Sequence, residues 1–157
     1  MTESTQATEL AQDLYALVVY MHKHCNADLF EAVGALELSL TQIKVLHHLE
    51  DQPTGELPLS GAAELVHVSL PAASRLVDDL VRRGFVERRE DAVDRRMKRV
   101  SITGQGRLVI RRLNAARLSG LEGFAQGLNA GEREALGDAL GKLLARPEVA
   151  ACRLEAE

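Results

Sequence analysis

The apolar residues near the start of the chain recur with the spacing of an α-helix. Between Thr8 and Val33 they form a stripe with a period close to 3.6, which predicts one long helix. The stripe consists of Leu10, Leu14, Leu17, Val18, Met21, Cys25, Leu29 and Val33. Other apolar side chains lie outside it: Tyr15, Val19, Tyr20 and Phe30. A helix that is apolar on more than one face must bury more than one face, so we expect it to contact a second chain as well as its own domain.

Two shorter helices are predicted after Gly34, which fits the end of the first helix. Thr41 can cap one of them, and Ser60 can cap the other, which runs from Gly61 to about Val66. Between them, Leu57-Pro58-Leu59 predicts a short extended piece, in which the proline fits only an edge strand.

The next helix is predicted from Ser69 to Gly84. Ser69 can cap its start, Gly84 fits a left-handed end, and Pro71 removes only an N–H group that has no partner within the helix. Its apolar face holds Ala73, Leu76, Val77, Leu80 and Val81. Together with the preceding helix it predicts a helix, a tight turn and a helix. His67 lies in that turn at a position where glycine is common. Glycine adopts a left-handed backbone easily, so the backbone angle of His67 is the unusual feature of this predicted turn.

After Gly84 the pattern changes from a helical period to that of strands. Residues 85–89 and 98–102 predict two short antiparallel strands, joined by a polar loop at 90–97. A basic hairpin directly after an amphipathic helix indicates a winged helix. In such a module the helix enters the DNA major groove, and the hairpin reaches the backbone or the adjacent minor groove.

Two Leu-rich helices, residues 104–127 and 130–145, follow the hairpin. Thr103 can cap the first, and an Asn129/Glu132 capping arrangement opens the second, which stops before Pro147. With the N-terminal helix, they are far longer than a DNA-binding module needs, which predicts a symmetric dimer interface. The predicted fold class is mainly α with a small antiparallel β-hairpin: a winged helix-turn-helix with long flanking dimerisation helices.

The length of 157 residues favours one compact domain. We expect a disordered N-terminus, an N-terminal dimerisation helix, the winged helix-turn-helix module, C-terminal dimerisation helices and a tail. The expected boundaries are 1–7, 8–34, 35–103, 104–146 and 147–157.

Charge is segregated along the chain. Residues 75–112 contain twelve Arg or Lys and six Asp or Glu, a net charge of +6. The whole chain carries −4, so the remaining residues carry −10. An excess of this kind on the helix and hairpin favours a polyanion partner, although a solvated Arg/Glu surface is the alternative. Aromatic residues are only 3% of the chain, which argues against a base-stacking, single-strand binder.

The remaining composition indicates a cytoplasmic protein. Cys25 and Cys152 are too few for a disulfide framework, and the N-terminus has no basic-then-apolar signal pattern. The longest apolar run, from Leu14 to Met21, is too short to span a bilayer, so no membrane partner is expected.

These motifs together resemble the MarR family of bacterial transcriptional regulators. The resemblance covers about residues 8–145 and rests on Leu40-Thr41, the helix from Ser69 to Gly84, the Asp94-Arg95-Arg96 loop and Ile102-Thr103-x-x-Gly106. It implies a homodimer on double-stranded DNA with a pseudo-palindromic operator. Such regulators are usually repressors, released by a small-molecule effector or an oxidant.

The predicted DNA contacts fall on the helix and on the hairpin. On the polar side of the helix they are Ser69, Pro71, Ala72, Ser74, Arg75 and Arg82. Arg75 can bind guanine with two hydrogen bonds, or it can pair with Asp78 or Asp79 on its own helix. By resemblance, Asp94 orients Arg96, which enters the minor groove, while Arg95 and Lys98 meet phosphates. A mobile charged loop is the alternative for this hairpin.

Effector sites in the resembled family lie between the first helix, the second helix and the DNA module. Met21, His22, Cys25 and His47 are the candidates here, with partly buried polar packing as the alternative. A redox-sensing regulator acting through Cys25 is a second alternative, although an interior, apolar cysteine is usually inert. His22, His24, Cys25 and His47 are possible zinc ligands. Zinc-sensing members of the resembled family draw ligands from the last two helices, which lack histidine here, so we expect no metal site and no cofactor.

We do not expect an enzyme. The chain has no P-loop, no H-E-x-x-H and no G-x-S-x-G motif, and Gly104-Gln105-Gly106 lacks the third glycine of a dinucleotide fingerprint. A third possibility is a winged helix that binds a partner protein instead of DNA, which the +6 segment disfavours.

Overall fold

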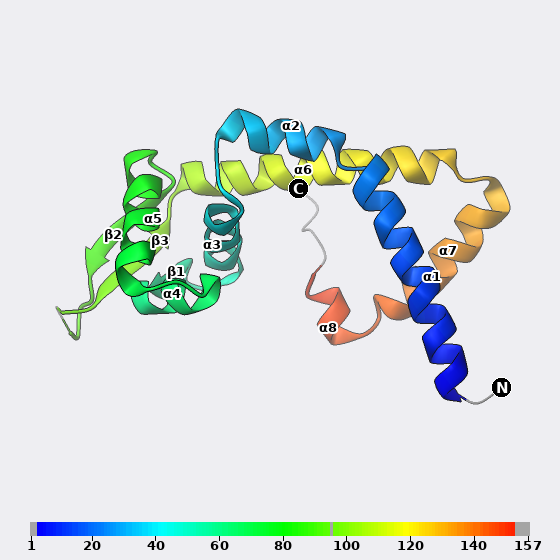
Figure 1. Cartoon of the computed structure of the whole chain (residues 1–157), viewed down its shortest axis with the longest axis horizontal. Helices are drawn as coiled ribbons and strands as arrows, with labels where there is room; N and C mark the ends of the chain where they lie inside the picture. The colour runs from blue at the N-terminus through cyan, green and yellow to red at the C-terminus, as the bar shows by residue number, and fades with distance from the viewer. Residues whose placement is uncertain (1–2, 95, 153–157) are drawn as a thin grey trace. The chain divides into compact units, whose positions relative to one another are not determined.

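The computed structural model describes residues 3–94 and 96–152, which form helices α1–α8 and strands β1–β3 (Figure 1). The chain divides into two compact units. One contains Ala32–Leu113, and the other combines residues 1–31 with residues 114–157. None of the described helices is both long enough and apolar enough to cross a membrane.

The unit of residues 32–113 contains the predicted DNA-binding module. The chain enters it through the end of α2 and leaves it along the first half of α6. Its elements are α2 (Ala27–Leu36), α3 (Leu40–Asp51), β1 (Glu56–Pro58), α4 (Leu59–Val66), α5 (Leu70–Arg82), β2 (Val86–Glu90), β3 (Lys98–Ile102) and α6 (Gly104–Gly127). The predicted combination of a mainly helical chain and an antiparallel hairpin is confirmed.

The three strands form one antiparallel sheet in the order β1-β3-β2. The hairpin pairs Val86 with Ile102, and Glu90 with Lys98. β1 pairs with β3 through Leu57 and Val100, so β1 is an edge strand, as its proline predicted. The sheet therefore has one strand more than the predicted hairpin.

The core of this unit lies where α5 meets α4, α3 and β2. Leu46, Leu49 and Leu80 are completely buried there. Burying one such leucine side chain contributes about 1.5–3 kcal/mol, so the α5 face that carries Leu80 fixes the helix on the rest of the unit.

Thr103 and Gly106 fix the start of α6. The Thr103 hydroxyl donates to the carbonyl oxygen of Gly84 at 2.7 Å and accepts the Gly106 N–H at 3.0 Å. A Cβ atom on Gly106 would overlap the carbonyl oxygen of Phe85. Only glycine therefore allows α6 to approach the start of β2 this closely.

The second unit has little core of its own. It contains α1 (Glu3–His24), the start of α2, the second half of α6, α7 (Ala130–Leu143) and α8 (Pro147–Ala150). Among its described residues, Cys25 is the one buried apolar side chain. Gly120 of α6 lies so close to Cys25 that a Cβ atom would overlap the Cys25 carbonyl oxygen. Leucines that the sequence placed on an inward stripe, such as Leu10 and Leu14, are more than half exposed.

The predicted helix from Thr8 to Val33 is wrong in its extent. α1 begins at Glu3, within the segment expected to be disordered, and ends at His24, and α2 then runs past Gly34 to Leu36. At this break the Asn26 side chain donates to the His22 carbonyl oxygen at 3.2 Å. Side chains of this type compete with the helical backbone for hydrogen bonds.

Two predicted helix caps are also wrong. Ser39, not Thr41, caps α3, because its side chain accepts the Gln42 N–H while the Gln42 side chain accepts the Ser39 N–H. α4 begins after Pro58, so Ser60 lies in its first turn and does not cap it.

Other local predictions are confirmed. Ser69 caps α5, and Gly84 has a left-handed backbone with φ of 74°. Asn129 caps α7 with Glu132 in a capping box. His67 is left-handed as well, with φ of 56°, which is the unusual angle that the turn before α5 requires.

Candidate nucleic-acid interface

The N-terminal turn of α5 is the surface on which the predicted major-groove contacts lie. The Ser69 side chain accepts the Ala72 N–H at 3.4 Å and so begins the helix. Pro71 and Arg75 are exposed, whereas Ala72 and Ser74 are half-buried. The opposite face buries Ala73, Val77 and Leu80 in the core. The helix thus presents a row of small side chains outward, which allows another surface to approach its backbone closely.

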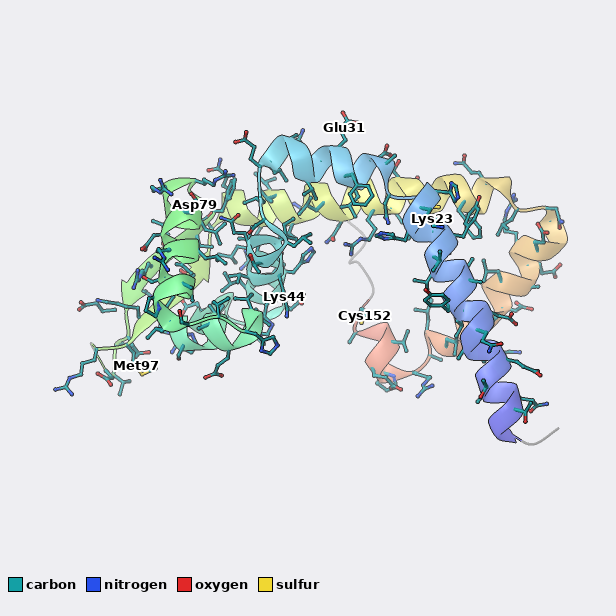
Figure 2. All side chains as sticks on the ribbon, viewed as in Figure 1. Lys23, Glu31, Lys44, Asp79, Met97 and Cys152 are labelled. Atoms are coloured by element: carbon teal, nitrogen blue, oxygen red, sulfur yellow. The ribbon has the colours of Figure 1, made fainter. Side chains whose placement is uncertain are left out.

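The two arginines predicted on α5 differ in their surroundings. Arg75 is exposed, and none of the described ion pairs involves it, so the predicted alternative of pairing with Asp78 or Asp79 does not occur. Arg82 instead pairs with Asp79 at 2.6 Å. Figure 2 labels Asp79, which lies near the C-terminal end of α5. Arg75 therefore carries a cation that is open to an external anion.

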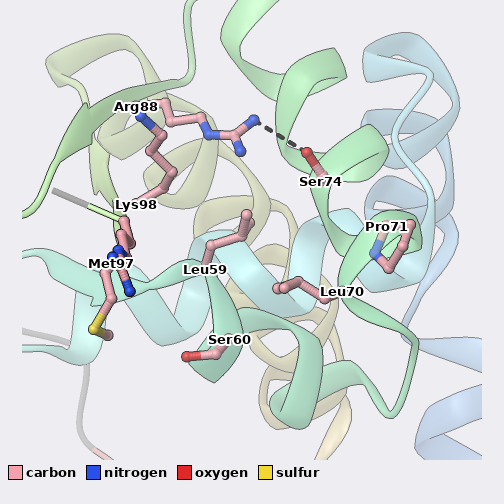
Figure 3. Close-up of a pocket in the computed structure, with 9 residues that line it drawn as sticks. Leu59, Ser60, Leu70, Pro71, Ser74, Arg88, Met97 and Lys98 are labelled. Carbon is pink, nitrogen blue, oxygen red and sulfur yellow. Dashed lines mark hydrogen bonds between the residues drawn. The ribbon is translucent and has the colours of Figure 1, made fainter. Parts of the chain in front are cut away.

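Arg88 of β2 joins the hairpin to α5, a role that the sequence analysis missed. Its Nη1 donates to the Ser74 hydroxyl at 3.1 Å (Figure 3). The same atom donates to the Asp78 carboxylate at 2.8 Å. Arg88 shares a face of β2 with the buried Val86, two residues earlier. That alternation was the available signal that Arg88 points inward. Its Nε is buried with no hydrogen-bond partner among the described residues.

The loop between β2 and β3, residues 91–97, forms the wing. The Asp94 Oδ1 accepts the backbone N–H of Arg96 at 3.0 Å, so the carboxylate orients this residue through its main chain. The Arg96 side chain is exposed, and none of the described ion pairs involves it. Arg95, which was also predicted to contact DNA, lies outside the described residues.

Ion pairs hold the base of the wing. Lys98, another predicted phosphate contact, pairs with Glu90 at 2.8 Å, and its hydrogen bond lowers the pKa of Glu90. Glu56 of β1 pairs with Arg89 and Arg99, and the Arg89 hydrogen bond is the main cause that lowers the pKa of Glu56. These carboxylates stay ionised at neutral pH. Glu90 is already counted in the net charge of +6, whereas Glu56 lies outside that segment and offsets one more of its positive charges.

A hollow of about 480 Å³ lies between the start of α5 and the wing (Figure 3). It is lined by Leu59, Ser60, Leu70, Pro71, Ser74, Arg88, Arg96, Met97 and Lys98. Cationic and hydroxyl side chains surround an apolar floor. Four of the predicted DNA contacts, Pro71, Ser74, Arg96 and Lys98, therefore come together around one depression.

The predicted effector residues do not all belong to one unit. Met21 and His22 lie on α1, and Cys25 directly follows it, whereas His47 lies on α3. His22 is exposed and contacts Asn26 and the edge of Phe30. The role of these four residues in effector binding remains a prediction. Within the described residues, no group of three or more His, Cys, Asp or Glu side chains is arranged to hold a metal ion.

A second hollow, of about 320 Å³, lies within the unit that contains α1. Cys25 is the predicted effector residue that lines it, together with Tyr20, His24, Ala27, Asp28, Gly120, Gly123 and Phe124. Cys25 is 7% exposed and Cys152 is exposed; both are free thiols. Burial of Cys25 disfavours the redox alternative, because a reactive thiol needs access to its oxidant.

A helix with an exposed N-terminal turn, preceded by a second helix and followed by an antiparallel hairpin, defines a winged helix-turn-helix. The sequence model described as the MarR family matches residues 36–97, which run from the end of α2 to the wing. The part of the chain that forms the winged helix-turn-helix therefore matches the MarR-family sequence model.

Solved structures agree with this assignment of the fold. The transcriptional regulator Tm0710 from Thermotoga maritima is 19% identical, with a TM-score of 0.74 over 91% of this chain and 99% of that chain. A MarR-family transcriptional regulator from Silicibacter pomeroyi is 29% identical, with a TM-score of 0.51 over 90% of each chain. A variant of S. aureus MepR bound to an oligodeoxyribonucleotide is 22% identical, with a TM-score of 0.65 over 83% of this chain and 96% of that chain.

Proposed function

We propose that this chain is a sequence-specific regulator of transcription that binds double-stranded DNA through α5 and the wing. The observation that carries the proposal is which of the predicted basic residues form ion pairs within the chain. Arg82 and Lys98 are neutralised by partners within the chain, whereas none of the described ion pairs involves Arg75 or Arg96. A free arginine on the groove helix and another on the wing match the division of major-groove and minor-groove contacts in winged helices.

Three further observations support this interpretation of the surface. The small side chains Pro71, Ala72 and Ser74 leave room for a base edge to approach α5. The hydroxyl and cationic groups around the adjacent hollow suit a sugar-phosphate strand. The MepR variant, whose fold this chain shares, was solved with an oligodeoxyribonucleotide bound.

We propose further that the regulator is a homodimer formed through the unit that contains α1. Leu14 and Val18 on α1, and Leu118 on α6, are exposed in the single chain. A second copy would remove this apolar surface from water and supply the core that the unit lacks. Two winged helices related by two-fold symmetry would then read a pseudo-palindromic operator.

In its regulatory role we propose a repressor that a small-molecule effector releases from DNA. We propose that the predicted effector residues bind this molecule: Met21, His22, Cys25 and His47. A reporter placed behind the selected operator should be silent with the regulator present and active when the effector is added. Transcription that rises with the regulator alone would contradict repression.

The first experiment selects bound sequences from random duplex DNA at physiological salt. An enriched pseudo-palindrome, with half-sites about one helical turn apart, is the expected result. Arg75→Ala and Arg96→Ala should each weaken binding to that sequence at least about tenfold, since each removes a base-edge or minor-groove contact. Arg112→Ala is the matched control for loss of one positive charge, since Arg112 is an exposed arginine of α6 outside α5, the wing and the unit proposed to dimerise. Folded protein that enriches no sequence would contradict the proposed function.

A further inference from the structure

Asp91 builds the turn at the tip of the wing. Its Oδ1 accepts two backbone N–H groups, that of Val93 at 2.8 Å and that of Asp94 at 3.1 Å. Its own N–H donates to the Met97 carbonyl oxygen at 3.0 Å, which closes the loop. One residue therefore determines the backbone path on both sides of the tip, in the manner of an Asx turn.

The other carboxylate oxygen of Asp91 is tied to the sheet. Oδ2 accepts from Arg99 Nη1 at 2.9 Å, and Arg99 Nε lies 3.4 Å from Glu56 on β1. The Asp91 side chain is only 12% exposed, although its neighbours in the loop are exposed. The Arg99 hydrogen bond is the main cause that lowers the pKa of Asp91 to about 2. The tip is thus anchored to β3, and through Arg99 to Glu56 of the edge strand β1, by ion pairs that are charged at neutral pH.

Two carboxylates act in sequence along the wing. Asp91 holds the backbone of Asp94, and the Asp94 carboxylate holds the backbone N–H of Arg96 at 3.0 Å. The position of Arg96 at its Cα therefore depends on Asp91, five residues earlier. We propose that Asp91 is a positioning residue for DNA binding, which holds Arg96 where it reaches the minor groove. This inference rests on the proposed function, in which the wing contacts DNA.

Charge and positioning predict opposite changes in DNA affinity when Asp91 is replaced. Removing the Asp91 carboxylate takes a negative charge from a surface that faces a polyanion, which by charge alone should tighten DNA binding. A positioning role requires the opposite. Once the turn relaxes, Arg96 loses its fixed geometry and must lose conformational entropy on binding. If a variant that has lost this negative charge binds DNA more weakly, the loss of affinity therefore results from lost positioning and not from charge.

The experiment measures affinity for the selected operator by fluorescence anisotropy, with the full chain at fixed salt. Asp91→Ala should weaken binding about tenfold, which corresponds to about 1.4 kcal/mol. Asp91→Asn should weaken binding less than Asp91→Ala, because the amide oxygen still accepts both turn N–H groups, although its NH2 group can no longer accept from Arg99. Glu87→Ala is the matched control, since it removes an exposed carboxylate from β2 and should bind as tightly as wild type or more tightly.

A double-mutant cycle with Arg96→Ala identifies the route. If Asp91 acts through Arg96, Asp91→Ala should cost little further affinity in the Arg96→Ala background. Additive losses would overturn the inference, as would Asp91→Ala that binds like wild type or Asp91→Asn that binds as weakly as Asp91→Ala. A wild-type chain that binds no duplex at all would instead overturn the proposed function, so the two failures are distinguishable. Circular dichroism and thermal unfolding of each variant report that it is folded.

Discussion

Arg88 of β2 and Asp78 of α5 form an ion pair, with Nη1 of the arginine 2.8 Å from Oδ1 of the aspartate. The same Nη1 reaches the Ser74 hydroxyl one turn earlier on α5. The pair therefore links the wing's first strand to the helix that we propose enters the major groove. Two surfaces that must meet DNA together are held at one relative orientation before DNA arrives, which reduces the entropy cost of binding.

We predict that Arg88→Met separates DNA affinity from stability. The Arg88 side chain is 27% exposed and that of Asp78 is 55% exposed, and pairs of this kind contribute about 0–1 kcal/mol to folding. The free energy of unfolding in urea should therefore change by no more than about 1 kcal/mol. Operator affinity should fall by more than the stability change accounts for, because the helix and the wing lose their link. Equal binding by the variant would show that the link has no part in recognition.

Leu80→Ala should destabilise the module severely. Leu80 is completely buried on the inner face of α5, so truncation removes apolar contacts and leaves a cavity, at a cost of about 2–5 kcal/mol. Leu40→Ala is the matched control, since Leu40 is 79% exposed and its loss should change stability by less than about 0.5 kcal/mol. Urea unfolding measures both. Similar losses for the two variants would contradict the assigned core.

Much of this module could be predicted because its signals are local. Ser69 and Gly84 mark the ends of α5 by their own backbone preferences, and the strand period marks β2 and β3. The break after α1 could not be predicted from periodicity, since the apolar stripe continues across it. At the break the Asn26 side chain donates to the His22 carbonyl oxygen, a contact that the spacing of apolar residues does not encode.

The contacts that organise the site were harder to predict, because they join residues far apart in the sequence. The charge count along the sequence included Arg88 and Asp91, but it could not identify the ion-pair partner of either residue. Arg88 meets Asp78 only when the hairpin folds back on α5, and Arg99 meets Asp91 only in the paired strands. Likewise, Ser39 and Thr41 are both competent caps, and the choice follows from where the Gln42 side chain lies.

Acid should weaken the folded state through the carboxylates of the wing. The folded-state pKa of Asp91 is lowered to about 2, and the pKa values of Glu56 and Glu90 are lowered as well. A carboxyl with a lowered pKa binds fewer protons folded than unfolded, so its stabilisation is complete above the unfolded pKa near 4 and is lost as the pH falls through the folded pKa. The free energy of unfolding should fall between about pH 5 and pH 2. Asp91→Asn should show a shallower fall in urea titrations across this range, and profiles of equal slope would contradict the lowered pKa.

The exposed apolar face of α1 gives the test of the dimer. Val18 is 60% exposed in the single chain, and in a dimer built through this unit it would be covered. Val18→Glu would then bury an unpaired carboxylate, which raises the dissociation constant of the dimer at least about tenfold. Gln12→Glu adds the same charge to α1 at an exposed position outside the stripe that holds Leu14 and Val18, so it should leave the dimer intact.

Light scattering on a dilution series measures the mass of each variant. Wild type and Gln12→Glu should have the mass of two chains at micromolar concentration, whereas Val18→Glu should shift toward the mass of one. Operator affinity should fall together with the dimer, because a single winged helix reaches only one half-site of a pseudo-palindrome. A wild-type monomer at this concentration, or a Val18→Glu dimer as tight as wild type, would show that α1 does not form the interface. The exposed face of α1 would then need a different partner, and the operator would be expected to contain one half-site instead of two.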